Sequence, residues 1–92
     1  MAPHIALHEI GVALLMAERT SDAVPLLDAA ARLRPEDAGY IADAGFAQLR
    51  AGNLGAARVR LERASGIDEA DPITRAYLAE LVRVEALAGR TN

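Results

Sequence analysis

Two histidines near the start of the chain have a spacing that can hold a metal ion. His4 and His8 lie four residues apart, which places both imidazoles on one face of a helix, and imidazole is a common ligand of Zn²⁺. A third ligand would have to come from Glu9 or from elsewhere, because the chain has no cysteine and no other histidine. We therefore expect two solvated histidines, no metal and no other cofactor. A pH-dependent contact of His8 stays open.

Acid–base and nucleophilic chemistry find no better support. Asp43 and Glu80 can face each other across a groove, but acid–base catalysis needs a positioned pair with separated pKa values, and nothing near them suggests one. The two serines, Ser21 and Ser65, stand in no arrangement typical of a nucleophile. These residues fail the requirements of a catalytic site, so we predict that the protein is not an enzyme.

The charged residues point away from nucleic acids and membranes. The net charge of −3 gives no general attraction to either. Arg58, Arg60 and Arg63 form a small basic cluster, but Glu62 dilutes it and no aromatic side chains accompany it for base stacking. We expect this cluster to be a solvated helix face.

The amino-terminal residues do not have the full pattern of a signal peptide. Residues 1–17 are apolar, as in a signal peptide, but no basic segment precedes them and Glu9 interrupts them. No apolar run reaches the ~20 residues that span a bilayer. We predict a cytoplasmic protein with no membrane partner.

The composition favours helices packed closely within one small domain. The 92 residues include 21 alanines and 12 leucines, which are strong helix formers, and only three aromatic residues. A chain of this length forms one domain, with a stability on the order of 5 kcal/mol. Helices with methyl groups on their contact faces can approach closely.

A period of 34 residues organises the chain. At this shift small or apolar residues align: Leu7 with Ile41, Gly11 with Gly45, Ala23 with Ala57, Leu27 with Leu61, Ala30 with Ala64, and Leu33 with Ile67. A second shift aligns Ala79 with both glycines, so we expect a helix crossing at each of the three positions. Within one unit the residues recur at i, i+4 and i+7 on two separate stretches, which predicts a helical hairpin.

Prolines and capping residues set the expected helix ends. Thr20 and Ser21 are expected to cap one helix, Asp37 the next, and Asp71-Pro72 gives a strong helix start. Pro25 is expected in a first turn or just beyond it, Arg34-Pro35 ends a helix, Gly52-Asn53 forms a turn, and Gly66 is expected to fray a helix end. The predicted helices are residues 4–17, 21–34, 38–51, 54–66 and 72–88.

The pattern Gly11…Ala23…Leu27…Ala30…Pro35, repeated as Gly45…Ala57…Leu61…Ala64, resembles the tetratricopeptide repeat (TPR). The resemblance implies an all-α fold: a short right-handed solenoid of two TPR helical hairpins plus a C-terminal capping helix. It implies a single domain over 1–92, with repeat 1 at about 4–37, repeat 2 at about 38–71 and the capping helix at about 72–88. The chain departs from the family pattern at three places. It has Leu7 and Ile41 where tryptophan is common, Leu14 and Gln48 where tyrosine is common, and Glu69 where proline is usual.

The resemblance also implies a concave groove, lined by the first helix of each hairpin, that binds a peptide or a protein subunit. The predicted partner-binding residues are Ile5, His8, Val12, Leu15, Ala42, Phe46, Leu49, Tyr77, Glu80 and Val84. The same helices also offer Glu9, Met16, Asp43, Arg50, Ile73, Ala76 and Arg83. Phe46 falls in the middle, with a place in the core as its alternative. An apolar groove is similar to that of the small TPR chaperones of bacterial type III secretion. This resemblance implies a bacterial chaperone with a secreted client.

The last helix leaves a second function open. Leu78, Leu81 and Val82 have no following helix to cover them, and exposed apolar patches usually mark a partner surface. The alternative is therefore a self-associating structural or scaffold module, a homodimer with no separate client.

Overall fold

The computed structural model describes residues 2–90, and all regular structure in that range is α-helical. The helices are α1 (Pro3–Met16), α2 (Thr20–Leu33), α3 (Ala38–Arg50), α4 (Leu54–Ile67) and α5 (Pro72–Arg90). The all-α prediction is confirmed, and every predicted helix boundary lies within two residues of the observed one.

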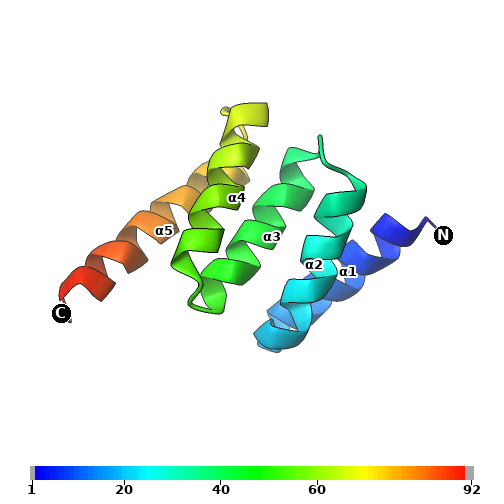
Figure 1. Ribbon diagram of the computed structural model, residues 1–92, viewed down its shortest axis with the longest axis horizontal. Coiled ribbons are helices and arrows are strands. Elements are labelled where there is room, and N and C mark those ends of the chain that lie inside the picture. The colour runs from blue at the N-terminus through cyan, green and yellow to red at the C-terminus, as the bar shows by residue number, and fades with distance from the viewer. Residues whose placement is uncertain (1, 91–92) are drawn as a thin grey trace.

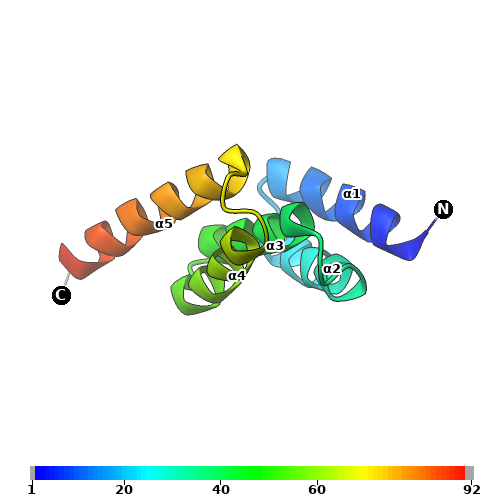
Figure 2. The same ribbon diagram turned by 90° about the horizontal axis from the view of Figure 1, so that it is seen from above.

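The five helices form two antiparallel hairpins and one further helix (Figure 1). α1 pairs with α2, α3 pairs with α4, and α5 packs against both α3 and α4. Seen from above, α2 and α4 lie on one side of α3, while α1 and α5 slope away from it on the other (Figure 2). The molecule is a slab of 45 × 28 × 18 Å.

Glycine is required where the two helices of each hairpin cross. A Cβ atom on Gly11 would lie 2.7 Å from Cγ of Leu27, and one on Gly45 would lie 2.9 Å from Cγ of Leu61. Both leucines are fully buried, so each fills the notch that its glycine leaves. The prediction of a third helix crossing at Ala79 is wrong. Ala79 is exposed, because no helix among residues 2–90 packs over that side of α5.

The turns inside the two hairpins have the same conformation. In each turn, N–H groups donate to the carbonyls three and five residues earlier, at distances of 2.8–3.0 Å. Gly52 adopts φ 85° in the second turn, and Glu18, one period earlier, adopts φ 62° in the first. Glutamate rarely adopts this left-handed conformation, which is why sequence reasoning found only the Gly52 turn.

Two of the three predicted caps are confirmed. Asp37 accepts a hydrogen bond from the N–H of Tyr40 at 3.1 Å, and Asp71 accepts bonds from the N–H and Oγ1 of Thr74 at 3.1 and 2.6 Å. The hydroxyl bond from Thr74 holds the pKa of Asp71 below its ordinary value. The third cap is wrong, because α2 already begins at Thr20 and no side chain caps it.

Pro25 lies just beyond the first turn of α2, which is one of its two expected placements, whereas Gly66 does not end α4, because that helix continues to Ile67. Proline removes one backbone donor there, and the helix still continues to Leu33.

The core is thin and rich in methyl groups. Its fully buried members include Ala23, Ala30, Ala57 and Ala64, and few large side chains are completely enclosed. Such a core leaves no space for added atoms, because the alanines stand where helices touch.

The substitution Ala57→Leu is expected to overpack the second hairpin and lower its free energy of unfolding by about 1–3 kcal/mol. Ala57 has no exposed surface and belongs to the cluster around Leu61, whereas Ala13 on α1 is exposed. Thermal denaturation followed by circular dichroism should show a lower melting midpoint for Ala57→Leu and little change for the control Ala13→Leu. An unchanged midpoint for Ala57→Leu would contradict this packing.

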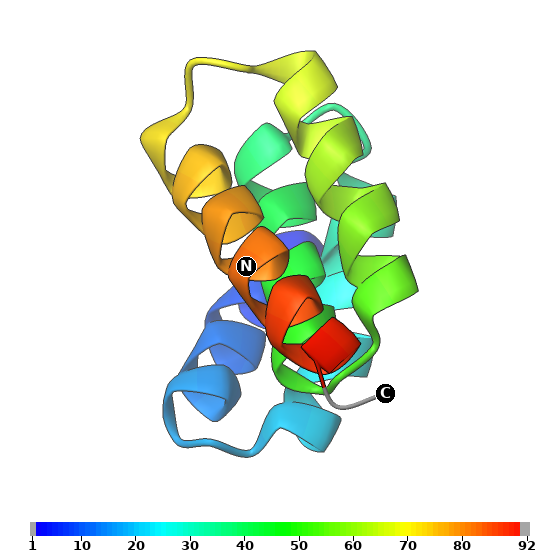
Figure 3. The same ribbon diagram turned by 90° about the vertical axis from the view of Figure 1, so that its left-hand side faces the viewer.

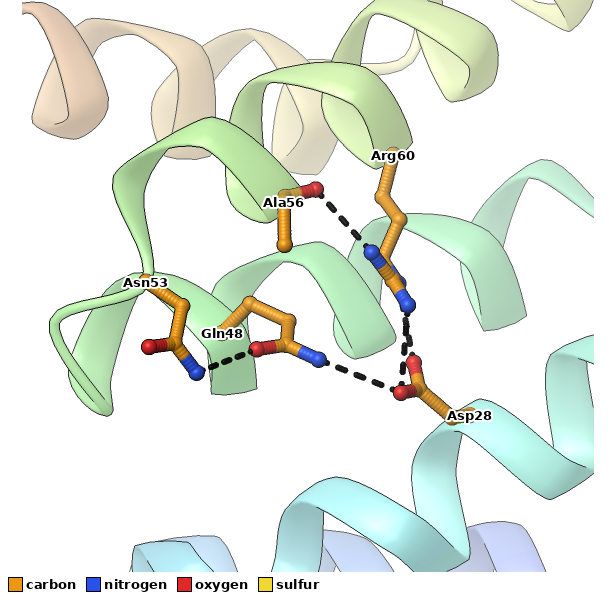
Figure 4. A network of polar contacts seen from close by, with 5 residues as sticks. All are labelled: Asp28, Gln48, Asn53, Ala56 and Arg60. Atoms are coloured by element: carbon orange, nitrogen blue, oxygen red, sulfur yellow. Dashed lines mark hydrogen bonds and ion pairs between the residues drawn. The ribbon is translucent and has the colours of Figure 1, made fainter.

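A polar network ties the hairpins together (Figure 4). Asp28 of α2 accepts bonds from Nε and Nη2 of Arg60 at 2.9 and 3.2 Å, and from Nε2 of Gln48 at 3.1 Å. Gln48 in turn accepts a bond from Asn53 at 2.8 Å. On the other side of α4, Arg58 pairs with Glu85 of α5. The expectation of a solvated arginine face is therefore wrong for Arg58 and Arg60, which link neighbouring helices.

Candidate functional site

The side of the molecule formed by α1, α3 and α5 holds a hollow of about 330 Å³, which we call the groove. Its lining is Val12, Leu15, Met16, Glu18, Asp43, Phe46, Arg50 and Tyr77. Met16 is 80% exposed at its edge. Three helices that lie far apart in the sequence thus present apolar side chains to one shared space.

Stacked aromatic rings form the middle of this groove. Phe46 of α3 and Tyr77 of α5 stack with centroids 4.2 Å apart and planes inclined by 11°. The guanidinium carbon of Arg50 lies 5.9 Å from the centroid of the Phe46 ring. Phe46 is partly buried and packs against the core with one side while it lines the hollow, so both of its expected placements hold in part.

A carboxylate at the centre of α3 joins the walls of the groove. Asp43 contacts Nε2 of His8 on α1 at 2.7 Å and accepts a bond from the hydroxyl of Tyr77 on α5 at 3.2 Å. His8 also stacks on Tyr40, with ring centroids 4.2 Å apart and planes inclined by 4°. The expectation of a solvated His8 is therefore wrong. These contacts cross-brace the three helices and help to set the width of the groove.

Burial, followed by the nearby Asp43 carboxylate, raises the pKa of Tyr77 to about 12. Both effects disfavour the negative phenolate. Tyr77 therefore stays protonated across the neutral range and donates its hydrogen bond to Asp43. Because the pKa of a free tyrosine is about 10, this contribution to stability is fully present below that pH. It is lost as the pH rises through about 12.

In a Tyr40→Phe variant, Tyr77 is the one remaining phenol, and we expect its ultraviolet titration to fall near pH 12. The matched variant Tyr77→Phe leaves Tyr40 as the reporter and shows which part of the wild-type curve belongs to each residue. Circular dichroism at each pH separates ionisation of the folded chain from alkaline unfolding. Titration of Tyr77 near pH 10 in the folded chain would show that the phenol is solvated and free of Asp43.

Charged side chains flank the hollow unevenly. Arg50 lies 3.9 Å from Glu18, whose side chain is 83% exposed, so this ion pair is long and solvated. Glu80 instead receives a hydrogen bond from Arg83 at 2.6 Å, which lowers the pKa of Glu80 below its ordinary value. Arg50 is thus the more available charge at the groove.

The structure brings together part of the predicted partner-binding set. Val12, Leu15, Phe46 and Tyr77 line the hollow, and His8 reaches it through Asp43. Of the remaining predicted residues, Ile5, Glu80 and Val84 lie outside the lining. Glu18, which lies in the turn after α1, was missed.

Two predicted groove residues are wrong because they belong to the core. Ala42 has no exposed surface and Leu49 is 4% exposed, and both lie in the cluster around Leu61. Neither side chain can contact a partner without local unfolding.

The residues predicted for association at the end of the molecule do not all lie on the exposed side of α5. Leu81 is fully buried, and Leu78 is partly buried against the same core cluster. Val82, the next residue along α5, is 58% exposed. Leu81 is thus wrong as an association residue, and Val82 remains available.

No group of three acidic, histidine or cysteine side chains within residues 2–90 is arranged to hold a metal ion. Over the same range, no helix is both long enough and apolar enough to cross a bilayer. Comparison with models of protein families and with curated proteins found no match for this chain, so the tetratricopeptide assignment stays a prediction drawn from its residue spacing.

Proposed function

We propose that this domain binds an amphipathic helix of another protein in its concave groove. The observation that carries the proposal is the hollow between α1, α3 and α5, where apolar and aromatic side chains from all three helices remain accessible. Burial of such a surface by the apolar face of a helix is a common mode of peptide recognition.

The centre of the groove offers the chemistry of an anchor site. The stacked Phe46 and Tyr77 rings, with Leu15 and Met16 beside them, suit a large apolar side chain. Aromatic residues in the middle of an interface often contribute most of its binding energy. We therefore expect one leucine-sized or aromatic side chain of the partner to occupy this place.

The groove is also partly preorganised. The contacts of Asp43 with His8 and Tyr77 hold the two sloping helices against α3 in the absence of a partner. A site that is ordered before binding loses less conformational entropy when the partner arrives. This supports a groove that serves as a binding surface.

The available charge defines the partner further. Arg50 stands next to Phe46, and the ion pair that it forms among residues 2–90 is the long, exposed one with Glu18. A carboxylate on the partner can form a bidentate pair with the guanidinium of Arg50. Glu18 forms only one contact with it, at 3.9 Å. We expect an acidic residue one helical turn from the apolar anchor.

Panning a displayed library of helical peptides against the purified chain tests this function. Retained peptides should share apolar residues at i and i+4 and an acidic residue within one turn of them. Retention of no peptide, or of peptides without a common apolar spacing, would contradict the proposal. The roles of secretion chaperone and non-enzyme, and a cytoplasmic location, remain predictions from the sequence.

A further inference from the structure

The outward side of α5 has no neighbouring element among the described residues. Figure 3 looks onto this end of the molecule, with α5 in front and nothing crossing it. α5 has 19 residues, whereas the other helices have 13 or 14. Its exposed stripe at helical spacing consists of Ala79, Val82 and Ala86. A small, apolar and uncovered helix face therefore forms one end of the slab.

The 34-residue period shows what this stripe is shaped to accept. Gly45 and Ala79 occupy equivalent positions on α3 and α5. At Gly45 the side chain of Leu61 enters the notch from a crossing helix. Ala79 offers a similar notch, but it is exposed. An apolar side chain from another helix can fill it.

The charges along α5 alternate in sign. In order they are Asp71 before the first turn, then Arg75, Glu80, Arg83, Glu85 and Arg90. Within residues 2–90, Arg75 and Arg90 form no ion pair. A pattern that ends with opposite signs is complementary to its own reversed copy.

We infer that two copies of this chain pair through the outer stripes of α5, antiparallel and related by a two-fold axis. One alignment joins the exposed stripes and also brings together the charges nearer the two ends of α5. When Val82 of one copy lies over Ala79 of the other, Arg90 stands at the height of Asp71. Arg75 then stands one residue, about 1.5 Å of helix rise, from the height of Glu85. Such an interface is isologous, so each contact occurs twice.

This pairing lies beyond the groove function and uses other residues. A single pair of helices buries less than the ~1,200–2,000 Å² of a typical stable interface, so the dimer should be weak, with a dissociation constant on the order of micromolar. Its antiparallel arrangement also places the positive end of each helix dipole beside the negative end of the other.

A charge-pairing experiment by analytical ultracentrifugation tests both the dimer and its alignment. Ala79→Arg and Val82→Glu should each weaken the homodimer at least about tenfold, because each places two buried, unpaired charges in the interface. In an equimolar mixture, one contact pairs the new arginine with the new glutamate, and the other keeps the native valine and alanine. The mixture should therefore form heterodimers close to wild-type affinity.

Three controls keep the outcome decisive. Both positions are exposed, so circular dichroism should show folded variants. Val59→Glu, at a 67% exposed site on α4, and Leu33→Glu, at a 53% exposed site on α2, should both dimerise as the wild type does. A wild-type chain that stays monomeric at all concentrations would overturn the inference. So would single variants that dimerise as well as wild type, or a mixture of folded variants that stays monomeric.

Discussion

Replacement of Leu81 by glutamate is expected to abolish most of the folding stability, whereas the same replacement at Val82 should leave the monomer nearly as stable as wild type. Leu81 has no exposed surface and lies in the cluster around Leu61, while Val82 is 58% exposed. Glutamate at position 81 removes a buried side chain and leaves an unpaired carboxylate in the core. Together these effects should cost more than about 3 kcal/mol, against a total stability on the order of 5 kcal/mol.

Urea denaturation followed by circular dichroism measures this difference. Each chain should be studied at a concentration low enough to keep it monomeric, so that pairing through α5 does not contribute. Val82→Glu should have a denaturation midpoint near that of the wild type. Similar losses in both variants would contradict the observed orientation of α5, because that orientation alone separates two adjacent residues.

The helix boundaries were predictable because local chemistry sets them. Asp37 and Asp71 cap helices with side-chain hydrogen bonds, and Arg34, whose helical conformation is disfavoured by the following Pro35, leaves the helix with φ −130° and ψ 69°. The 34-residue period also identified the glycine notches, because a close helix crossing demands the smallest residue at a fixed position. Where a feature depends on a few neighbouring residues or on a repeated position, the sequence alone sufficed.

The orientation of α5 was not predictable in the same way. Leu81 and Val82 are both apolar and point about 100° apart on the helix. Which of them is buried depends only on the positions of α3 and α4. Within residues 2–90, α5 has no hairpin partner of its own whose sequence pattern could indicate its buried side. The same limit explains why Ala42 and Leu49 were wrongly placed in the groove. They lie on α3, which other helices contact from several sides.

Long polar contacts were missed for a different reason. Arg60 reaches Asp28 over 32 residues and His8 reaches Asp43 over 35, and no local pattern relates these partners. One signal did exist, because Asp43 and Tyr77 are one period apart and so occupy equivalent positions on successive first helices. Periodicity could have placed these two residues side by side, although not the hydrogen bond between them.

Replacement of Phe46 by glutamate is expected to weaken binding of a library-selected peptide by at least about 30-fold, the effect of losing a central aromatic anchor. The substitution removes the ring that stacks on Tyr77 and places a charge on the apolar floor of the groove. Fluorescence anisotropy with the labelled peptide measures the change. Val59→Glu is the matched control, because Val59 is an exposed apolar residue on α4 and does not line the hollow.

A second substitution keeps this prediction testable if Phe46→Glu fails to fold. Arg50 is exposed, so Arg50→Glu should preserve the fold and weaken a peptide whose acidic residue contacts the guanidinium. Exchange of that acidic residue for arginine in the peptide should then restore the affinity for the Arg50→Glu chain, because the charges again attract one another. Restoration would place the peptide in the groove, with its acidic residue beside position 50. Equal binding by wild-type, Phe46→Glu and Arg50→Glu chains, all folded, would place the peptide elsewhere and leave the groove without a role in binding it.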